Sequence, residues 1–267
     1  MKKYLSFFRI RFSNGLQYRA AAWAGVSTQF VWGGMTLLLF RAFYQTGSKA
    51  FPMTFPELSS YIWLQQAFLA LYMSWYFDNE IFDSIISGNV SYELCRPMDT
   101  YTMWFIKNMS VRLSRAVLRC MPILIVAAFL PEPYNISLPV SLSAGLLFLL
   151  SMTLGFMLLV AFSMLIYISA FYTLSPMGIR ILTISVLEFF TGAIIPLPFF
   201  PESLQTLLYL LPFASIQNTP FQIYNGYMKG NEVSAAIMIQ AVWLLVLLAS
   251  GKLLMKQALR KAVVQGG

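Results

Sequence analysis

Histidine is absent from this sequence, and cysteine occurs only at Cys95 and Cys120. The lack of histidine removes the commonest general base and the commonest metal ligand. Cys95 falls in a charged stretch and Cys120 in an apolar one, so the pair predicts neither a disulfide framework nor a zinc site. We therefore expect no catalytic site and no metal site in this chain.

Charged residues are also scarce. They make up 10% of the chain, against 58% hydrophobic residues, and the mean hydropathy is +0.68. Soluble domains carry about 25% charged residues, so the composition indicates an integral membrane protein, with residues 1–267 forming a single transmembrane domain. In a soluble protein the net charge of +8 could suggest nucleic acid. Here the membrane topology accounts for the basic residues, and we expect no nucleic-acid partner.

Apolar segments of about 20 residues, long enough to cross a bilayer, recur along the chain. The sequence predicts an all-α fold with six transmembrane helices. These are residues 20–43, 58–77, 104–130, 140–172, 179–197 and 233–255.

The basic residues predict the orientation of these spans. Of the 18 lysines and arginines, 15 fall on one side of the predicted topology, and only Arg41, Lys49 and Lys229 fall on the other. Basic residues collect on the cytoplasmic side of membrane proteins. We therefore expect a multi-pass protein of the cell membrane, of bacterial type, with both termini in the cytoplasm.

The first 19 residues predict a helix that lies in the membrane interface. Leu5, Phe8, Phe12 and Leu16 fit one helical face, and lysines and arginines occupy the others. This is the pattern of an interfacial amphipathic helix. The alternative is a plain basic flank of the first span.

Residues 78–98 form a charged segment between the second and third spans. Asp78 can cap a helix there, and Gly88 is a natural C-terminal stop. That helix carries an apolar stripe that needs cover from lipid headgroups, from the chain's own spans or from a partner. The stripe consists of Ile81, Phe82, Ile85 and Ile86.

Two sets of charges fall inside predicted spans. Arg112, Arg115 and Arg119 share one face of the third span, which predicts either snorkelling to the headgroups or a vestibule lined with positive charge. Glu188 is the only acidic residue deep in a span, where a carboxylate is costly unless it is paired or protonated. It predicts either a contact with a substrate, proton or cation, or a structural hydrogen bond.

Residues 196–227 are rich in proline and contain a helix too short to span. An external re-entrant hairpin between the fifth and sixth spans fits this pattern, provided that protein or water covers its backbone. In the fourth span, Ser151 and Gly155 are four apart and would let another helix approach closely.

Two stretches resemble the type-2 ABC exporter family. Residues 84–101, SIISGNVSYELCRPMDTY, are similar to the family's pattern of an amphipathic helix, a glycine and a Leu-x-Arg-Pro turn. The segment 196–227, with Tyr224-Asn225-Gly226 near its end, resembles the family's second region. The positions that match the first pattern are Ile85, Gly88, Leu94, Arg96 and Pro97.

The resemblance implies a permease with no enzymatic site of its own. Two permease subunits, identical or paralogous, would lie side by side in the lipid, and each would rest on a cytoplasmic ATPase that holds ATP and Mg²⁺. The segment 78–98 would be the coupling helix, with the stripe and the five matching positions docking onto the ATPase. The absence of a phosphate-binding loop from this chain agrees with a separate motor.

The expected transport path lies near spans one, two and five, with Glu188, Arg119 and Arg115 as candidate residues. Many aromatic residues and methionines favour an adaptable apolar path, so we expect a small amphiphile, a drug or a peptide-like toxin as substrate. One alternative is a stand-alone secondary transporter or channel that uses Glu188 to couple an ion. Another is an intramembrane enzyme, for which the usual acid–base and metal-ligand residues are missing.

Overall fold

A computed structural model describes residues 2–47, 51–173 and 175–261, and 76% of these described residues lie in helices and none in a strand. Lys49, predicted on the external side, lies outside the described residues. The helices are α1 Lys2–Gly15, α2 Arg19–Gly47, α3 Phe55–Ala67, α4 Leu69–Tyr72, α5 Asn79–Ile86, α6 Val90–Leu94, α7 Thr100–Ala128, α8 Leu142–Ser169, α9 Met177–Phe190, η2 Leu197–Phe199, α10 Glu202–Leu210, α11 Asn218–Asn225 and α12 Asn231–Lys261.

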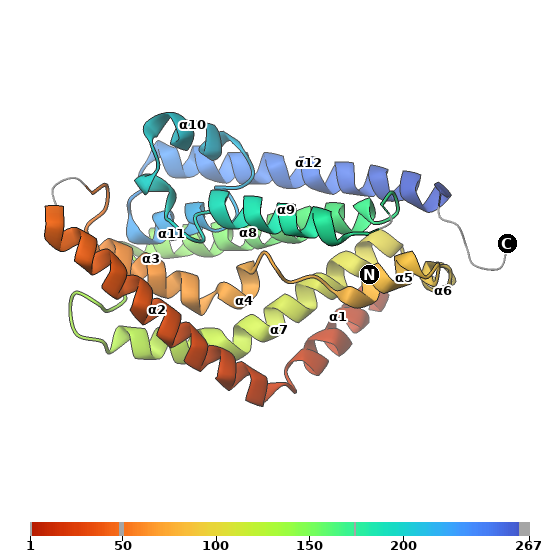
Figure 1. Cartoon of the computed structure of the whole chain (residues 1–267), viewed down its shortest axis with the longest axis horizontal. Helices are drawn as coiled ribbons and strands as arrows, with labels where there is room; N and C mark the ends of the chain where they lie inside the picture. Colours follow the sequence, from red (N-terminus) through yellow and green to blue (C-terminus); the bar gives the residue numbers. More distant parts are fainter. Residues whose placement is uncertain (1, 48–50, 174, 262–267) are drawn as a thin grey trace.

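The long helices run lengthwise in an elongated bundle (Figure 1). One end, called here the α10 end, carries α10 and the loop between α7 and α8. The opposite end, the α5–α6 end, carries those two short helices and the last turns of α12 (Figure 1).

Two described helices are both long and apolar enough to cross a membrane. They are α8 and residues Asn231–Arg260 of α12, with mean hydropathies of 2.4 and 2.2. Helices α2 and α7 have 29 residues each, or about 43 Å at 1.5 Å per residue, but polar and charged side chains lower their hydropathy. The prediction of six spans therefore stays a prediction.

Helix α1 lies alongside the first half of α7. The main-chain N–H of Asp99 donates to the Tyr4 hydroxyl over 3.0 Å, and a Cβ added to Gly15 would lie 2.0 Å from the Ser114 hydroxyl. Leu5, on the predicted apolar face, is 70% exposed, as a side chain that faces lipid would be, and the interfacial placement of α1 stays a prediction. Phe7 packs against the core.

The predicted second span is not one helix. Helix α3 ends at Ala67, α4 covers only Leu69–Tyr72, and residues 73–78 are not helical. The prediction of a continuous span over 58–77 is therefore wrong beyond Tyr72. The hydrogen-bond partners of this unwound stretch come from α7, as described below.

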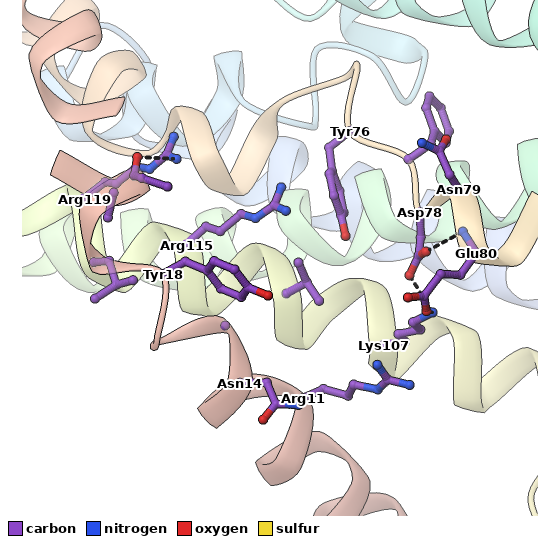
Figure 2. A pocket seen from close by; sticks show the side chains of 16 residues that line it. Arg11, Asn14, Tyr18, Tyr76, Asp78, Asn79, Glu80, Lys107, Arg115 and Arg119 are labelled. Atoms are coloured by element: carbon purple, nitrogen blue, oxygen red, sulfur yellow. Dashed lines mark hydrogen bonds and ion pairs between the residues drawn. The ribbon is translucent and has the colours of Figure 1, made fainter. Parts of the chain in front are cut away.

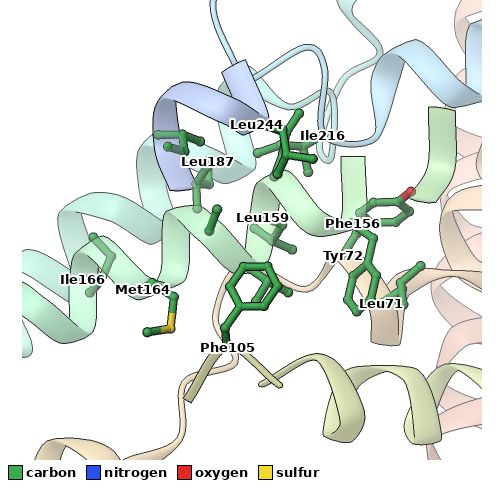
Figure 3. Packing of buried hydrophobic residues seen from close by; sticks show 14 of the residues in the cluster. Leu71, Tyr72, Phe105, Phe156, Leu159, Met164, Ile166, Leu187, Ile216 and Leu244 are labelled. Carbon is green, nitrogen blue, oxygen red and sulfur yellow. The ribbon is translucent and has the colours of Figure 1, made fainter. Parts of the chain in front are cut away.

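The main hydrophobic core forms around α8. Leu159 of α8 lies among Phe105 of α7, Leu187 of α9 and Leu244 of α12 (Figure 3). The close approach predicted at Ser151 and Gly155 is present. The Ser151 hydroxyl lies 2.9 Å from the Gln240 side-chain oxygen of α12, and a Cβ on Gly155 would lie 2.0 Å from the Ile216 carbonyl oxygen.

The predicted fifth span ends early, at Phe190. The backbone of Gly192 has a φ of +80°, and a Cβ there would lie 2.7 Å from the Tyr61 hydroxyl, so the chain turns where a side chain does not fit. Beyond this turn, η2, α10 and α11 form the segment 196–227. Helix α11 packs against α3 and α8. Helix α10 lies at the same end of the bundle as the loop between α7 and α8 (Figure 1).

Candidate functional site

Helix α5 begins and ends as its sequence predicts. The Asp78 carboxylate accepts a hydrogen bond from the Glu80 main-chain N–H over 3.0 Å, which caps the first turn. After Ile86, the backbone of Gly88 takes a φ of +73°, a conformation that favours glycine. The predicted cap and stop are confirmed, and together they fix the length of the helix.

The structure divides the apolar stripe on α5. Ile81 and Phe82 are buried in the chain's own core, and the Phe82 ring lies 5.0 Å from that of Tyr167 on α8. Ile85 is half-buried, whereas Ile86 is 56% exposed. This corrects the expected docking surface, because α5 packs its inner face on α8 and leaves Ile81 and Phe82 out of a partner's reach.

Four apolar side chains of α5, α6 and the following turn are exposed, and we call this set the tip patch: Ile86, Tyr92, Leu94 and Pro97. Tyr92 is 74% exposed and Leu94 is 43% exposed. Sequence reasoning missed Tyr92, because its neighbours Ser91 and Glu93 are polar and no stripe marks it. Arg96 is exposed beside the patch, but Gly88 is buried.

Lys107 of α7 holds the start of α5 in place. Its ammonium nitrogen lies 2.7 Å from a carboxylate oxygen of Asp78 and 2.7 Å from one of Glu80 (Figure 2). The hydrogen bond and the charge of Lys107 lower the pKa of Glu80 below its ordinary value. On the other side, the Asp78 N–H donates to the Tyr167 hydroxyl over 2.7 Å. The segment is therefore fastened to both α7 and α8.

Arg112 of α7 binds the unwound stretch between α4 and α5. Its guanidinium is fully buried and donates to three main-chain carbonyls, those of Leu71 (3.3 Å), Met73 (2.7 Å) and Tyr76 (2.9 Å). It also donates to the Asn108 side chain over 2.6 Å. Arg112 therefore neither snorkels nor lines a vestibule, and the prediction for this arginine is wrong in both forms.

A charged cavity of about 700 Å³ lies between α1, α7 and the residues before α5. Arg11, Arg115 and Arg119 line it together with the Lys107 cluster (Figure 2). The Arg115 guanidinium stacks over the Tyr76 ring, 4.4 Å from its centre.

A second cavity, of about 660 Å³, lies between α2, α3 and α9 and is called here the central cavity. Glu188 and Arg119 both line it, whereas Arg115 does not. The Ser74 hydroxyl donates to the Glu188 carboxylate over 3.2 Å. Two of the three candidate path residues are thus brought together, and Arg119 lies between the two cavities because it lines both.

The central cavity also has polar walls that sequence reasoning missed. Three glutamines line it, Gln29 on α2 and Gln65 and Gln66 on α3, together with the indole rings of Trp32 and Trp75. Glutamines scattered through apolar helices give no pattern that would predict a common site. Over the described part of the chain, no group of three or more acidic, cysteine or histidine residues could hold a metal ion.

Comparison with known proteins gives one family. The family model described as "ABC-2 family transporter protein" matches residues 30–266. This range contains α5, α6, α7 and most of the lining of both cavities. A search of curated proteins finds no match.

Proposed function

Because the chain belongs to the ABC-2 family of transporter proteins, we propose that it is one of two membrane subunits of an ATP-driven exporter. Membership makes the chain a permease component of an ABC transporter in a membrane. In our proposal, a separate cytoplasmic ATPase binds ATP and Mg²⁺ and performs hydrolysis. This chain supplies the transport path and the surface on which the ATPase docks.

The single observation that carries the docking role is the tip patch. It presents Ile86, Tyr92 and Leu94 to solvent on a segment whose inner face is fastened to the bundle. Several exposed apolar side chains on one short segment support an interaction site there. Because Lys107 of α7 and Tyr167 of α8 bind the start of α5, a force applied to the tip patch would be transmitted to α7 and α8.

The orientation follows from the basic residues. In our proposal the α5–α6 end faces the cytoplasm, because the side with 15 of the 18 lysines and arginines includes this end. The α10 end then faces outward. The two cavities lie in sequence along this direction, with Arg119 between them, and this arrangement supports a path from the charged cavity into the central cavity.

Export requires two global states that differ in their contacts. Closure of the ATPases would push both coupling segments, and rigid-body movement would open the central cavity to the outside. In the alternative, ion coupling through Glu188, transport would proceed without any ATPase. The family assignment favours the ATP-driven form.

Co-purification tests the proposal. The tagged chain is expressed with the ATPase encoded nearest to its gene, and the pair is isolated in detergent. We expect the ATPase to co-purify with the wild type and with Leu138→Asp, a control in which the exposed residue lies in the loop before α8 at the α10 end. Ile86→Asp and Tyr92→Asp should lose the ATPase. Equal recovery with all four proteins would contradict docking through the tip patch.

A further inference from the structure

We propose that the central cavity binds a short apolar peptide with free ends, through its amine, its backbone amides and its carboxylate. This inference rests on the proposed function only for the step of transport, because binding itself needs no ATPase. The argument starts from polar groups in the cavity wall that have no partner within the chain.

Gln29 is the clearest of these groups. It is only 2% exposed, and both its side-chain nitrogen and its side-chain oxygen lack a hydrogen-bond partner. The side-chain oxygen of Gln66 and the Nε of Arg119 are also unpartnered. Four of the eight buried, unpartnered side-chain atoms in the described residues thus belong to the wall of this one cavity. These atoms are buried in the chain without an occupant. Buried polar groups are nearly always satisfied, so we infer that these side chains turn toward an occupant of the cavity that supplies donors and acceptors.

These groups are spaced along α2. Gly25, Gln29 and Gly33 follow one another at intervals of four residues on one face of the helix. A Cβ on Gly25 would lie 2.5 Å from the Arg119 guanidinium carbon, and a Cβ on Gly33 would lie 3.1 Å from the Gln66 side chain. The order from the α5–α6 end is therefore Arg119, Gln29, Gln66. Gly25 and Gly33 are about 12 Å apart along the axis, roughly the length of three to four extended peptide residues.

Glu188 supplies the site for a cation. Its carboxylate accepts one hydrogen bond, from Ser74, and makes no ion pair with any described residue. The indoles of Trp32 and Trp75 line the same cavity, and indole faces attract cations. A protonated amine at Glu188 would neutralise a charge that is costly in a membrane.

Arg119 supplies the site for an anion. Its only hydrogen bond to a described residue is a long one of 3.5 Å to the Ala21 carbonyl, and its Nε is free within the described structure. A terminal carboxylate would meet it with a charge-assisted bond. An apolar peptide with both ends free carries the three kinds of group that this wall would bind, as well as side chains for the apolar part of the lining.

Binding of the tetrapeptide Phe-Ala-Ala-Phe to the chain in lipid nanodiscs tests the proposal without ATP. Three radiolabelled forms are compared: the free peptide, the N-acetylated peptide and the C-terminal amide. Empty nanodiscs correct for partition into lipid. We expect saturable binding of the free peptide, weakened about tenfold by loss of either charged end, which corresponds to 1.4 kcal/mol.

Variants assign each end to its residue. Glu188→Gln should abolish the preference for the free amine, and Arg119→Met should abolish the preference for the free carboxylate. Glu202→Gln, at an exposed position on α10, is the control and should keep both preferences. Gln29→Leu should weaken all three forms without lowering the melting temperature, because its amide makes no hydrogen bond within the described structure.

Absence of saturable binding, or equal binding of all three forms by the wild type, would overturn the inference. Retention of both preferences by Glu188→Gln and Arg119→Met would overturn it as well. If the ATPase co-purifies but no peptide binds, the inference fails while the proposed function stands. If peptide binds but no ATPase docks, the proposed function fails alone.

Discussion

The guanidinium of Arg112 donates a 2.7 Å hydrogen bond to the main-chain carbonyl of Met73, in the unwound stretch between α4 and α5. Non-helical backbone within a membrane has to find partners in protein or water. A fully buried arginine supplies them here, since its planar fork reaches several carbonyls at once. The bonds also hold residues 73–78 in position just before α5. The arginine therefore helps to position α5 and the tip patch that follows.

The Arg112→Met variant should therefore be less stable than the wild type. The substitution leaves the carbonyls of Met73 and Tyr76 without their donor in a buried place, at about 1–3 kcal/mol for each unsatisfied group. We expect a loss of at least about 2 kcal/mol, measured as a lower melting temperature in detergent. Arg115→Met is the control, because Arg115 stacks on Tyr76 but has no hydrogen bond to its carbonyl. An equal effect of the two substitutions would contradict the role given to Arg112.

Close packing at Gly155 gives a second prediction. A Cβ there would lie 2.0 Å from the Ile216 carbonyl oxygen, a backbone atom that cannot turn aside. Gly155→Ala should thus destabilise the chain by about 1–3 kcal/mol, the usual effect of overpacking. Gly34→Ala on α2 meets no atom within 4 Å and should be neutral or stabilising, since alanine favours helix over glycine. The melting temperatures of both variants test this prediction. An unchanged melting temperature for Gly155→Ala would contradict the close approach of Gly155 to the Ile216 carbonyl.

The Lys107–Glu80 pair predicts a dependence on pH. The pKa of Glu80 in the folded chain lies below its ordinary value of 4.5, because Lys107 bonds to the carboxylate and attracts it. The pair thus adds stability above pH 4.5, which is lost as pH falls through the lowered pKa. Since the Glu80 side chain is 77% exposed, we expect at most about 1 kcal/mol.

Melting temperatures of the wild type and Glu80→Gln between pH 6 and pH 3, a range that brackets the ordinary carboxylate pKa, check this prediction. The difference between them should shrink as the pH falls. A difference that stays constant or grows toward low pH would show that Glu80 is not stabilised in its charged form.

Much of this architecture is visible in the sequence because its causes are local. The Asp78 cap, the Gly88 stop and the length of α8 depend on residues that are neighbours along the chain. Helix periodicity likewise predicts α1, but it does not predict that Phe7 packs against the core. That detail depends on where α7 lies, and the sequence of α1 contains no information about it.

The parts that sequence reasoning missed depend on contacts between distant residues. Helix α4 ends at Tyr72 because Arg112, 39 residues after Met73, satisfies the carbonyls that a longer helix would otherwise pair. The end of α9 depends on Tyr61 lying against Gly192. Gln29 and Gln66 become a candidate site only when α2 and α3 pack together. Apolar composition cannot show these pairings, because each residue taken alone fits an ordinary span.

The most direct test of the central claim uses Cys95, which is exposed beside Leu94 of the tip patch. A Cys120→Ser background removes the other thiol, and maleimide labelling of Cys95 is timed in inside-out vesicles with and without the purified ATPase. We predict that the ATPase slows labelling severalfold in this background and has no effect when Ile86→Asp is added. Labelling at the same rate with and without the ATPase, or labelling only from the opposite face of the membrane, would contradict the account.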